Sequence, residues 1–118
     1  NPDMLAKYFV ADEKGDFRII DKVKELVSFS YLNLLDPHKT SLISHMDIIF
    51  CRNVIIYFDR EAKKKVIESF YHKLREGGYL LLGHSESLIN ISNAFVLRTL
   101  KHDMVYQKPV RREATYFK

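Results

Sequence analysis

A strand–helix–strand pattern over residues 47–84 constrains the fold of this chain more than any other feature. Residues 48–50 form an unbroken apolar run that is too short for a surface helix and does not alternate. Such a run is typical of a strand buried on both faces in a parallel sheet, here expected over residues 47–51. Residues 79–84 predict a second buried strand. The pattern predicts a βαβ unit with a right-handed crossover, within half of a doubly wound α/β sheet that has an antiparallel edge.

The segment between these two strands has the clearest helical pattern in the sequence. Apolar residues recur at every fourth position over residues 62–74, and Asp59 precedes them as an N-cap. We therefore expect a helix over residues 59–75. Gly77 is placed to end this helix with a left-handed C-terminal cap.

The rest of the chain predicts short elements around this unit. They are, in order, a helix-like segment over residues 4–9 with Asp3 as N-cap, a hairpin of residues 8–10 with 17–20, a short helix over 22–26 capped by Asp21, a strand over 27–34, a loop over 37–45, a short helix from Ser85 or Ser87 towards Ile91, and closing strands at 95–97 and 104–106. Pro37 should bar a strand or helix from continuing. The tail over residues 110–118 has no clear pattern.

Composition places the chain among soluble globular domains. It has 118 residues, of which 47% are hydrophobic and 29% charged, and no apolar run approaches the ~18 residues of a membrane span. No signal peptide is visible. The lone Cys51 is expected to be a packed, inert thiol, and this cysteine usage fits a reducing, cytoplasmic setting.

The net charge of +4 is spread over the chain. The three lysines at positions 63–65 lie among glutamates, which favours a solvated helix face over a nucleic-acid surface. One cysteine and five scattered histidines do not provide the ligand spacing of a zinc site, so we expect no metal.

Polar residues follow the first buried strand directly. In open α/β sheets, ligands bind beyond the carboxyl ends of the strands. Arg52 and Asn53, and the nearby Tyr57, therefore lie where a ligand pocket is expected. The strand pattern alone would also fit another nucleotide-binding α/β protein.

Three motifs resemble those of the chemotaxis receptor methyltransferases of the CheR type. They are residues 50–59, residues 77–86, and residues 27–29 with Asn33 and Leu34, in the order and spacing of that family. The resemblance covers residues 8–108. It implies the C-terminal half of a Rossmann-like class I methyltransferase sheet with an antiparallel edge hairpin, and a small inserted β-subdomain.

The resemblance implies an S-adenosylmethionine-dependent protein-glutamate O-methyltransferase, which leaves S-adenosylhomocysteine as product. Its substrates are glutamates on the cytoplasmic helices of chemoreceptors in bacterial chemotaxis, and neither nucleic acid binding nor membrane insertion is implied. It assigns residues 1–30 to the β-subdomain and its connection, 31–110 to the C-terminal part of the methyltransferase domain, and 111–118 to a tail.

Several features of the family are not found in this sequence. These are the glycine-rich cofactor loop with the motif that follows it, the N-terminal helical domain, and the acidic residue that holds the cofactor ribose. We therefore expect the chain to lack methyltransferase activity by itself. The alternative is a receptor-docking or regulatory binding module, because the β-subdomain of some members takes up a receptor C-terminal peptide by strand addition.

The resemblance assigns five residues to the site. Asn33 and Leu34 are placed at the adenine end of the cofactor, Arg52 and Asn53 contact the cofactor, and Tyr57 lies near the methyl donor, so that Tyr57 and Arg52 are the catalytic residues. The residues alone leave other interpretations open. Asn33 can cap a turn, Arg52 and Asn53 can form a solvated strand end, and Tyr57 can pack in the core.

The expected reaction needs no general base, since a glutamate side chain is already ionised at pH 7. The protein should supply in-line positioning and a water-poor pocket. We therefore interpret His84, Ser85 and Glu86 as a loop that shapes the pocket and caps the next helix, and not as catalytic residues.

Overall fold

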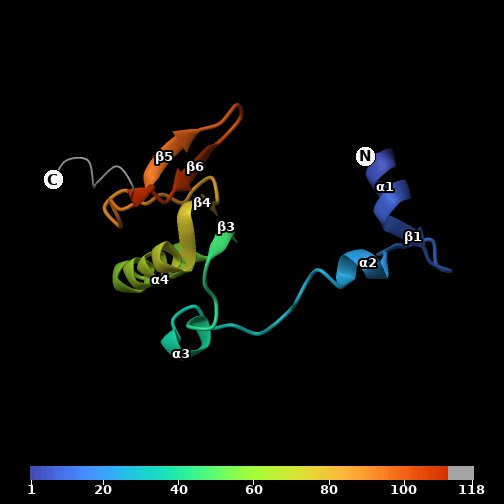
Figure 1. Cartoon of the computed structure of the whole chain (residues 1–118), viewed down its shortest axis with the longest axis horizontal. Helices are drawn as coiled ribbons and strands as arrows, with labels where there is room; N and C mark the ends of the chain where they lie inside the picture. The colour runs from blue at the N-terminus through green and yellow to red at the C-terminus, as the bar shows by residue number, and fades with distance from the viewer. Residues whose placement is uncertain (112–118) are drawn as a thin grey trace. The chain divides into compact units, whose positions relative to one another are not determined.

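The computed structural model describes residues 1–111 and divides the chain into two compact units (Figure 1). The first unit is Asn1–Tyr31, and the second begins at Leu32. Each unit has its own sheet, a two-stranded hairpin in the first and a four-stranded sheet in the second.

The first unit consists of short elements and has no buried residue. Its elements are α1 (Pro2–Tyr8), β1 (Phe9–Ala11), β2 (Phe17–Ile19) and α2 (Asp21–Lys24). β1 and β2 pair antiparallel, which confirms the predicted hairpin. Asn1 and not Asp3 caps α1, because the side chain of Asn1 accepts a hydrogen bond from the Asp3 amide at 2.9 Å. Asp21 is the first residue of α2 and not its cap.

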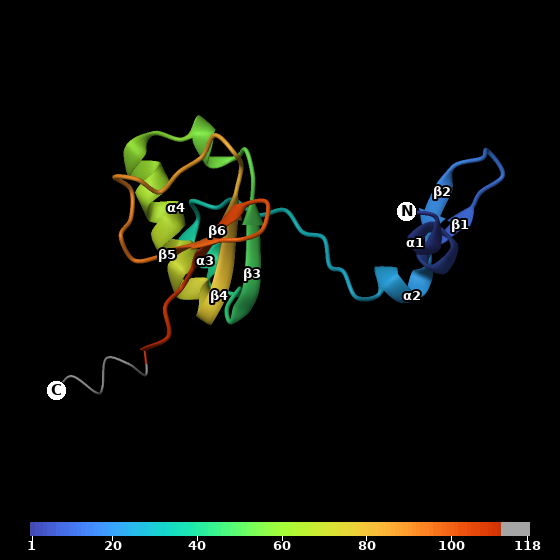
Figure 2. The ribbon, with the colours of Figure 1, turned by 90° about the horizontal axis from the view of Figure 1, so that it is seen from above.

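The predicted strand over residues 27–34 is wrong. This segment has no regular structure, and Figure 2 shows it as a coil between α2 and α3. Alternating side chains make a strand only where a neighbouring strand pairs with the backbone, and β1 and β2 pair only with each other among the described residues. The predicted loop over 37–45 contains a short helix, α3 (Pro37–Thr40), because proline is well tolerated in a first helical turn and Asp36 caps it.

The second unit contains the predicted βαβ pattern and its antiparallel edge. Its remaining elements are β3 (Met46–Cys51), the 3₁₀ turn η1 (Ile55–Tyr57), α4 (Arg60–Lys73), β4 (Leu74–Leu82), β5 (Val96–Thr99) and β6 (Met104–Gln107). The strand order is β3-β4-β6-β5, with β3 parallel to β4 and the other pairs antiparallel. This arrangement confirms the predicted α/β fold class.

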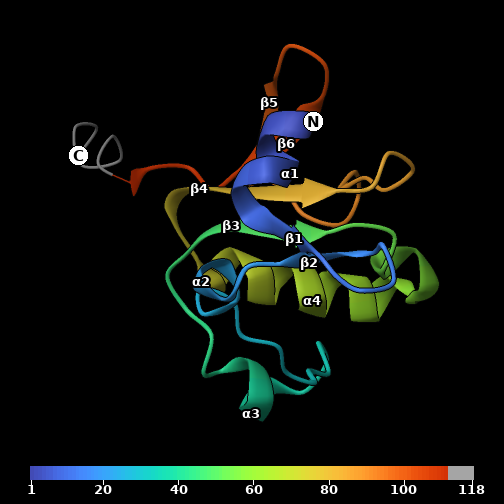
Figure 3. The ribbon, with the colours of Figure 1, turned by 90° about the vertical axis from the view of Figure 1, so that its right-hand side faces the viewer.

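Helix α4 lies along one face of β3 and β4, as Figure 3 shows. Asp59 caps it as predicted, since its carboxylate accepts from the Ala62 amide at 2.8 Å. Val66, Ile67 and Phe70 are buried against the sheet and form the centre of the core. The predicted apolar stripe of this helix is therefore its core-facing side.

The expectation that β3 is buried on both faces is wrong. Ile48 is 46% exposed and Phe50 is 67% exposed. Among the described residues β4 is the only strand that pairs with β3, so β3 is an edge strand with one covered face. An apolar run indicates a strand but does not indicate which of its sides find a neighbour.

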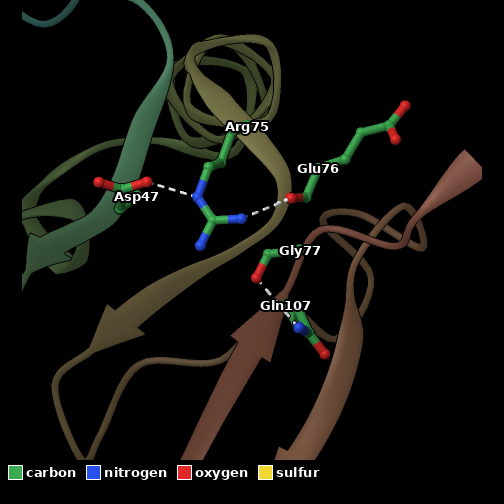
Figure 4. A network of polar contacts seen from close by, with 5 residues as sticks. All are labelled: Asp47, Arg75, Glu76, Gly77 and Gln107. Atoms are coloured by element: carbon green, nitrogen blue, oxygen red, sulfur yellow. Dashed lines mark hydrogen bonds and ion pairs between the residues drawn. The ribbon is translucent and has the colours of Figure 1, made fainter.

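Gly77 does not cap α4, contrary to prediction. The helix ends at Lys73, and Leu74 is already extended. Gly77 has φ +79° and lies where the register between β3 and β4 shifts, so its left-handed backbone serves a bulge in β4. Figure 4 shows the polar contacts at this end of the strands, where Arg75 pairs with Asp47 and the side chain of Gln107 donates to the Gly77 carbonyl at 3.0 Å.

The helix predicted from Ser85 or Ser87 towards Ile91 does not form, and the segment is a series of turns. Leu88 is buried and its amide donates to the Tyr106 hydroxyl at 3.2 Å, so the segment is held by contacts with the sheet. The predicted closing strands are confirmed as β5 and β6. Of the predicted tail, residues 112–118 lie outside the described residues. No helix within residues 1–111 has the length and apolar character to cross a membrane.

Candidate functional site

The carboxyl ends of the parallel strands β3 and β4 lie side by side (Figure 2). Cys51 pairs with Leu82 at this end of the sheet. Arg52 and Asn53 follow β3 directly, and Gly83 follows β4. The residues that follow the two strands therefore lie at the same edge of the sheet, which is where a ligand site is expected.

A buried carboxylate connects these two strand ends. Oε1 of Glu86 accepts a hydrogen bond from the Asn53 amide at 2.7 Å and another from the Gly83 amide at 2.8 Å. Glu86 is buried, and its second oxygen, Oε2, has no hydrogen-bond partner among the described residues. One side chain from the segment after β4 thus fixes the backbone after β3.

Asn53 and Gly83 approach each other closely at this point. Asn53 has φ +60°, a left-handed conformation that asparagine tolerates better than most residues. A Cβ atom at position 83 would lie 2.3 Å from Oδ1 of Asn53 and 2.8 Å from Oε1 of Glu86. Glycine is favoured at position 83 because a Cβ atom there would force both neighbouring side chains to move.

The thiol of Cys51 lies next to this cluster. Burial, and to a lesser extent the negative charge of Glu86, raises the pKa of Cys51 to about 11. The thiol is therefore protonated at neutral pH, which agrees with the predicted inert, packed cysteine.

A pocket of about 470 Å³ runs beside β3 and reaches Arg52. Leu34, Cys51, Arg52 and Val54 are among its lining residues, most of which are apolar. Two of the predicted site residues, Leu34 and Arg52, therefore line the same pocket although they are 18 positions apart in the sequence. Asn33 lies next to Leu34, and its side chain accepts from the Leu35 amide at 3.0 Å in a turn.

Tyr57 and the residues after β4 lie outside this pocket. Tyr57 is the last residue of η1 and is 81% exposed, so it is not the core tyrosine that one interpretation of the sequence allowed. His84 and Ser85 are exposed, and neither begins a helix. Asn53 turns its side chain towards Gly83 and is absent from the pocket lining.

Sequence reasoning missed the roles of Glu86 and Gly83. Glu86 was expected to help cap a following helix, and its carboxylate instead bonds to a residue 33 positions away. The available signal was a glycine directly after a predicted strand, with a glutamate three residues later. That signal does not identify Asn53 as the second donor.

Comparison with known protein families shows to which family the chain belongs. The model of the family described as CheR methyltransferase, SAM binding domain, matches residues 1–104. The chain belongs to this family. The match confirms the resemblance seen in the motifs, and it covers the first unit and residues 32–104 of the second unit of this CheR-type chain.

Several curated relatives of this CheR-type chain are named chemotaxis protein methyltransferases. It is 40% identical over 105 residues to chemotaxis protein methyltransferase 2 of Vibrio cholerae, a match that covers 89% of the chain and 36% of the relative. It is 39% identical over 107 residues to the chemotaxis protein methyltransferase of Vibrio parahaemolyticus, covering 91% and 38%. It is 34% identical over 107 residues to chemotaxis protein methyltransferase 1 of Pseudomonas aeruginosa, again covering 91% and 38%. The chain therefore spans little more than a third of the length of these relatives.

Proposed function

We propose that this chain is part of an S-adenosylmethionine-dependent protein-glutamate O-methyltransferase that acts on chemoreceptors in the cytoplasm. The observation that carries this proposal is the pocket along β3 that both Leu34 and Arg52 line. Both residues belong to motifs that the family resemblance assigns to the cofactor. The family description, which names a SAM binding domain, supports the same ligand.

The residues at this pocket fit such a cofactor. The volume of the pocket lies in the range of small-molecule sites, which is about 300–1,000 Å³. Leu34 and Val54 offer apolar surface to a purine, and the Arg52 guanidinium offers several donors to a carboxylate or to hydroxyls. The side-chain NH₂ of the adjacent Asn33 can donate to a purine nitrogen, while its oxygen accepts from the Leu35 amide.

The chemistry proposed here is methyl transfer to a carboxylate. The cofactor supplies a methyl group activated by a sulfonium. A glutamate oxygen of the receptor forms a bond to the methyl carbon while the carbon–sulfur bond breaks, and the electron pair of that bond returns to sulfur. No proton moves, so the protein needs to align the three reacting atoms and exclude water.

Within this proposal, Tyr57 acts at the methyl-donor end. Its exposed ring is available to face a cationic sulfonium, and its hydroxyl is available to orient the receptor carboxylate. Arg52 holds the cofactor from the pocket side. The chain contributes these groups, and the proposed reaction requires no general base because a glutamate side chain is already ionised at pH 7.

Calorimetric titration with S-adenosylhomocysteine tests the proposal. The protein is expressed in the longest form that its gene encodes. Binding should weaken at least tenfold in Arg52→Ala, because a charge-assisted contact of this kind contributes about 1.5–3 kcal/mol. Arg18→Ala, on β2 in the first unit, is the matched control and should bind as the wild type does.

Two results would contradict the proposal. One is a folded wild-type protein that does not bind S-adenosylhomocysteine. The other is an Arg52→Ala variant that binds with unchanged affinity. A methylation assay with a chemoreceptor cytoplasmic fragment then tests the substrate class, and Tyr57→Phe should lower the rate of transfer more than the affinity for S-adenosylhomocysteine.

The hairpin of the first unit supports a second candidate function, the docking of a receptor peptide. β1 and β2 pair only with each other among the described residues, so each has an outer edge with free backbone groups. Val10 and Phe17 are exposed on this hairpin and offer apolar contacts. An extended peptide can add to such an edge as a further strand.

Titration with a peptide of the chemoreceptor C-terminus tests this docking. Ala11→Pro should weaken binding if β1 is the receiving edge, and Phe17→Pro should do so if the edge is β2, because Ala11 and Phe17 oppose each other without mutual backbone hydrogen bonds and their amides therefore point to the outer edges. Peptide binding that neither proline affects would show that the hairpin edges are not the docking site.

A further inference from the structure

Glu86 is the only buried acidic residue within residues 1–111. Burying a carboxylate is costly unless its oxygens are hydrogen-bonded, and here Oε2 has no partner among the described residues. A side chain selected for stability alone would not leave a buried oxygen unpaired. The unpaired Oε2, together with the two bonds of Oε1, therefore points to a role beyond core packing.

The two bonds of Oε1 hold the backbone on both sides of the cluster, including the left-handed turn at Asn53. Asn53 is left-handed, with φ +60°, and its amide is one of the two donors to Glu86. The other donor is the amide of Gly83, at the end of the neighbouring strand. The carboxylate thus anchors the turn after β3 to the end of β4.

The same cluster sets the direction of the Asn53 side chain. Its Oδ1 occupies the space where a Cβ atom at position 83 would lie. Gly83 leaves this space open, and Glu86 holds the backbone that places Oδ1 there. The conformation of Asn53 is thereby determined by two residues that follow a different strand.

We propose that Glu86 is a positioning residue for the cofactor site, which acts through Asn53 and does not touch the cofactor. This inference rests on the proposed function and on the family resemblance, which assigns Asn53 to the cofactor although its side chain lies outside the pocket lining. Gly83 is the second part of the device, since it provides the room that the left-handed Asn53 requires.

The first test measures the device without any ligand. Amide protons that donate to a carboxylate are strongly perturbed by it, so the NMR signals of the Asn53 and Gly83 amides should shift together in Glu86→Gln and Glu86→Ala. Glu68→Ala, which truncates an exposed glutamate of α4, should leave both signals in place. Unchanged Asn53 and Gly83 signals in the Glu86 variants would overturn the proposal.

The second test is a double-mutant cycle on S-adenosylhomocysteine affinity in the longest form of the protein. Glu86→Ala should weaken binding at least tenfold, whereas Glu86→Gln, which retains one carbonyl oxygen to accept both amides, should bind within about threefold of the wild type. Asn53→Gly removes the side chain but leaves the left-handed backbone accessible. In the Asn53→Gly background, Glu86→Ala should change the affinity less than threefold.

The outcomes separate this inference from the proposed function. A merely structural glutamate would weaken binding by the same factor with or without the Asn53 side chain, and that additivity would overturn the positioning role while cofactor binding stands. If Glu86→Ala fails to fold, the cycle is made with Glu86→Gln and Asn53→Gly instead. Glu86→Gln that loses S-adenosylhomocysteine binding both in the wild-type and in the Asn53→Gly background would contradict the proposal. Wild-type protein that does not bind S-adenosylhomocysteine would overturn the proposed function, and the cofactor-positioning role with it, even where the amide signals respond.

Discussion

Cys51 and Glu86 show how one buried cluster changes the properties of single residues. The inert character of Cys51 was predictable, because the residue ends an apolar run and is the only cysteine. Its structure confirms this, with 5% of the residue exposed. The proximity of Glu86 was not predictable, because a hydrogen bond across 33 positions leaves no local trace in the sequence.

The raised pKa of Cys51 predicts a pH-dependent contribution to stability. Burial raises the pKa of the Cys51 thiol from 9.0 to about 11 in the folded chain, so the folded chain retains the thiol proton to a higher pH than the unfolded chain does. The contribution is complete below pH 9 and is lost as the pH rises to about 11, by up to ~3 kcal/mol. Urea unfolding of wild type and Cys51→Ala between pH 8 and 11 measures it as the difference between the two stabilities. Parallel pH curves for the two proteins would contradict it.

Gly83→Ala tests the close approach in the same cluster. The new methyl group would lie 2.3 Å from Oδ1 of Asn53, so the asparagine side chain must move. We expect a loss of about 1–3 kcal/mol in unfolding free energy. Ser85→Ala, at an exposed position two residues later, is the control and should change the unfolding midpoint little. Equal urea midpoints for the two variants would show that the cluster adapts without cost.

At the scale of the element, the sequence predicted the N-terminal end of α4 but not its C-terminal end. The N-terminal end was predicted because its cap, Asp59, is a local signal that bonds three residues ahead. The C-terminal end was mispredicted at Gly77. Its carbonyls at Tyr71 and Leu74 instead accept hydrogen bonds from Nζ of Lys108, at 2.8 and 2.9 Å, and no local pattern indicates a partner so far along the chain.

Asp59→Ala should lower the unfolding free energy by about 1 kcal/mol, because the Ala62 amide loses its acceptor. Asp59→Asn retains a side-chain acceptor, and asparagine caps helices about as well as aspartate. Its unfolding free energy should therefore stay within a few tenths of a kcal/mol of the wild-type value. Thermal or urea unfolding distinguishes the two substitutions. If alanine and asparagine are equally stable, the cap does not contribute.

Lys108→Met should cost about 1–2 kcal/mol of unfolding free energy. The substitution keeps most of the apolar stem but removes the donors to the end of α4 and the cation over the Tyr71 ring, which lies 4.6 Å from Nζ. Lys101→Met, in the exposed turn between β5 and β6, is the matched control and should be nearly neutral. A Lys108 variant as stable as the Lys101 variant would refute a role in ending the helix.

At the scale of the whole chain, the class of the fold was predictable and the partners of individual strands were not. The pattern of residues 47–84 yields the βαβ unit, because strand and helix periodicities are local properties. It could not reveal that residues 27–34 form no strand, nor that β3 lies at an edge of the sheet among the described residues. For the site, position relative to the strand ends placed Arg52 and Asn53, and only the folded chain shows that Leu34 lines the same pocket as Arg52.

The exposed edge of β3 has a consequence for the behaviour of the chain at high concentration. A strand with unpaired backbone groups and exposed apolar side chains is a template for edge-to-edge aggregation. We expect the 118-residue chain to self-associate as its concentration rises, and Ile48→Lys to suppress this association. Ile89→Lys, at an exposed position in the segment after β4, should not suppress it. Sedimentation velocity over a concentration series distinguishes the two variants, and equal self-association of both would show that β3 does not drive aggregation.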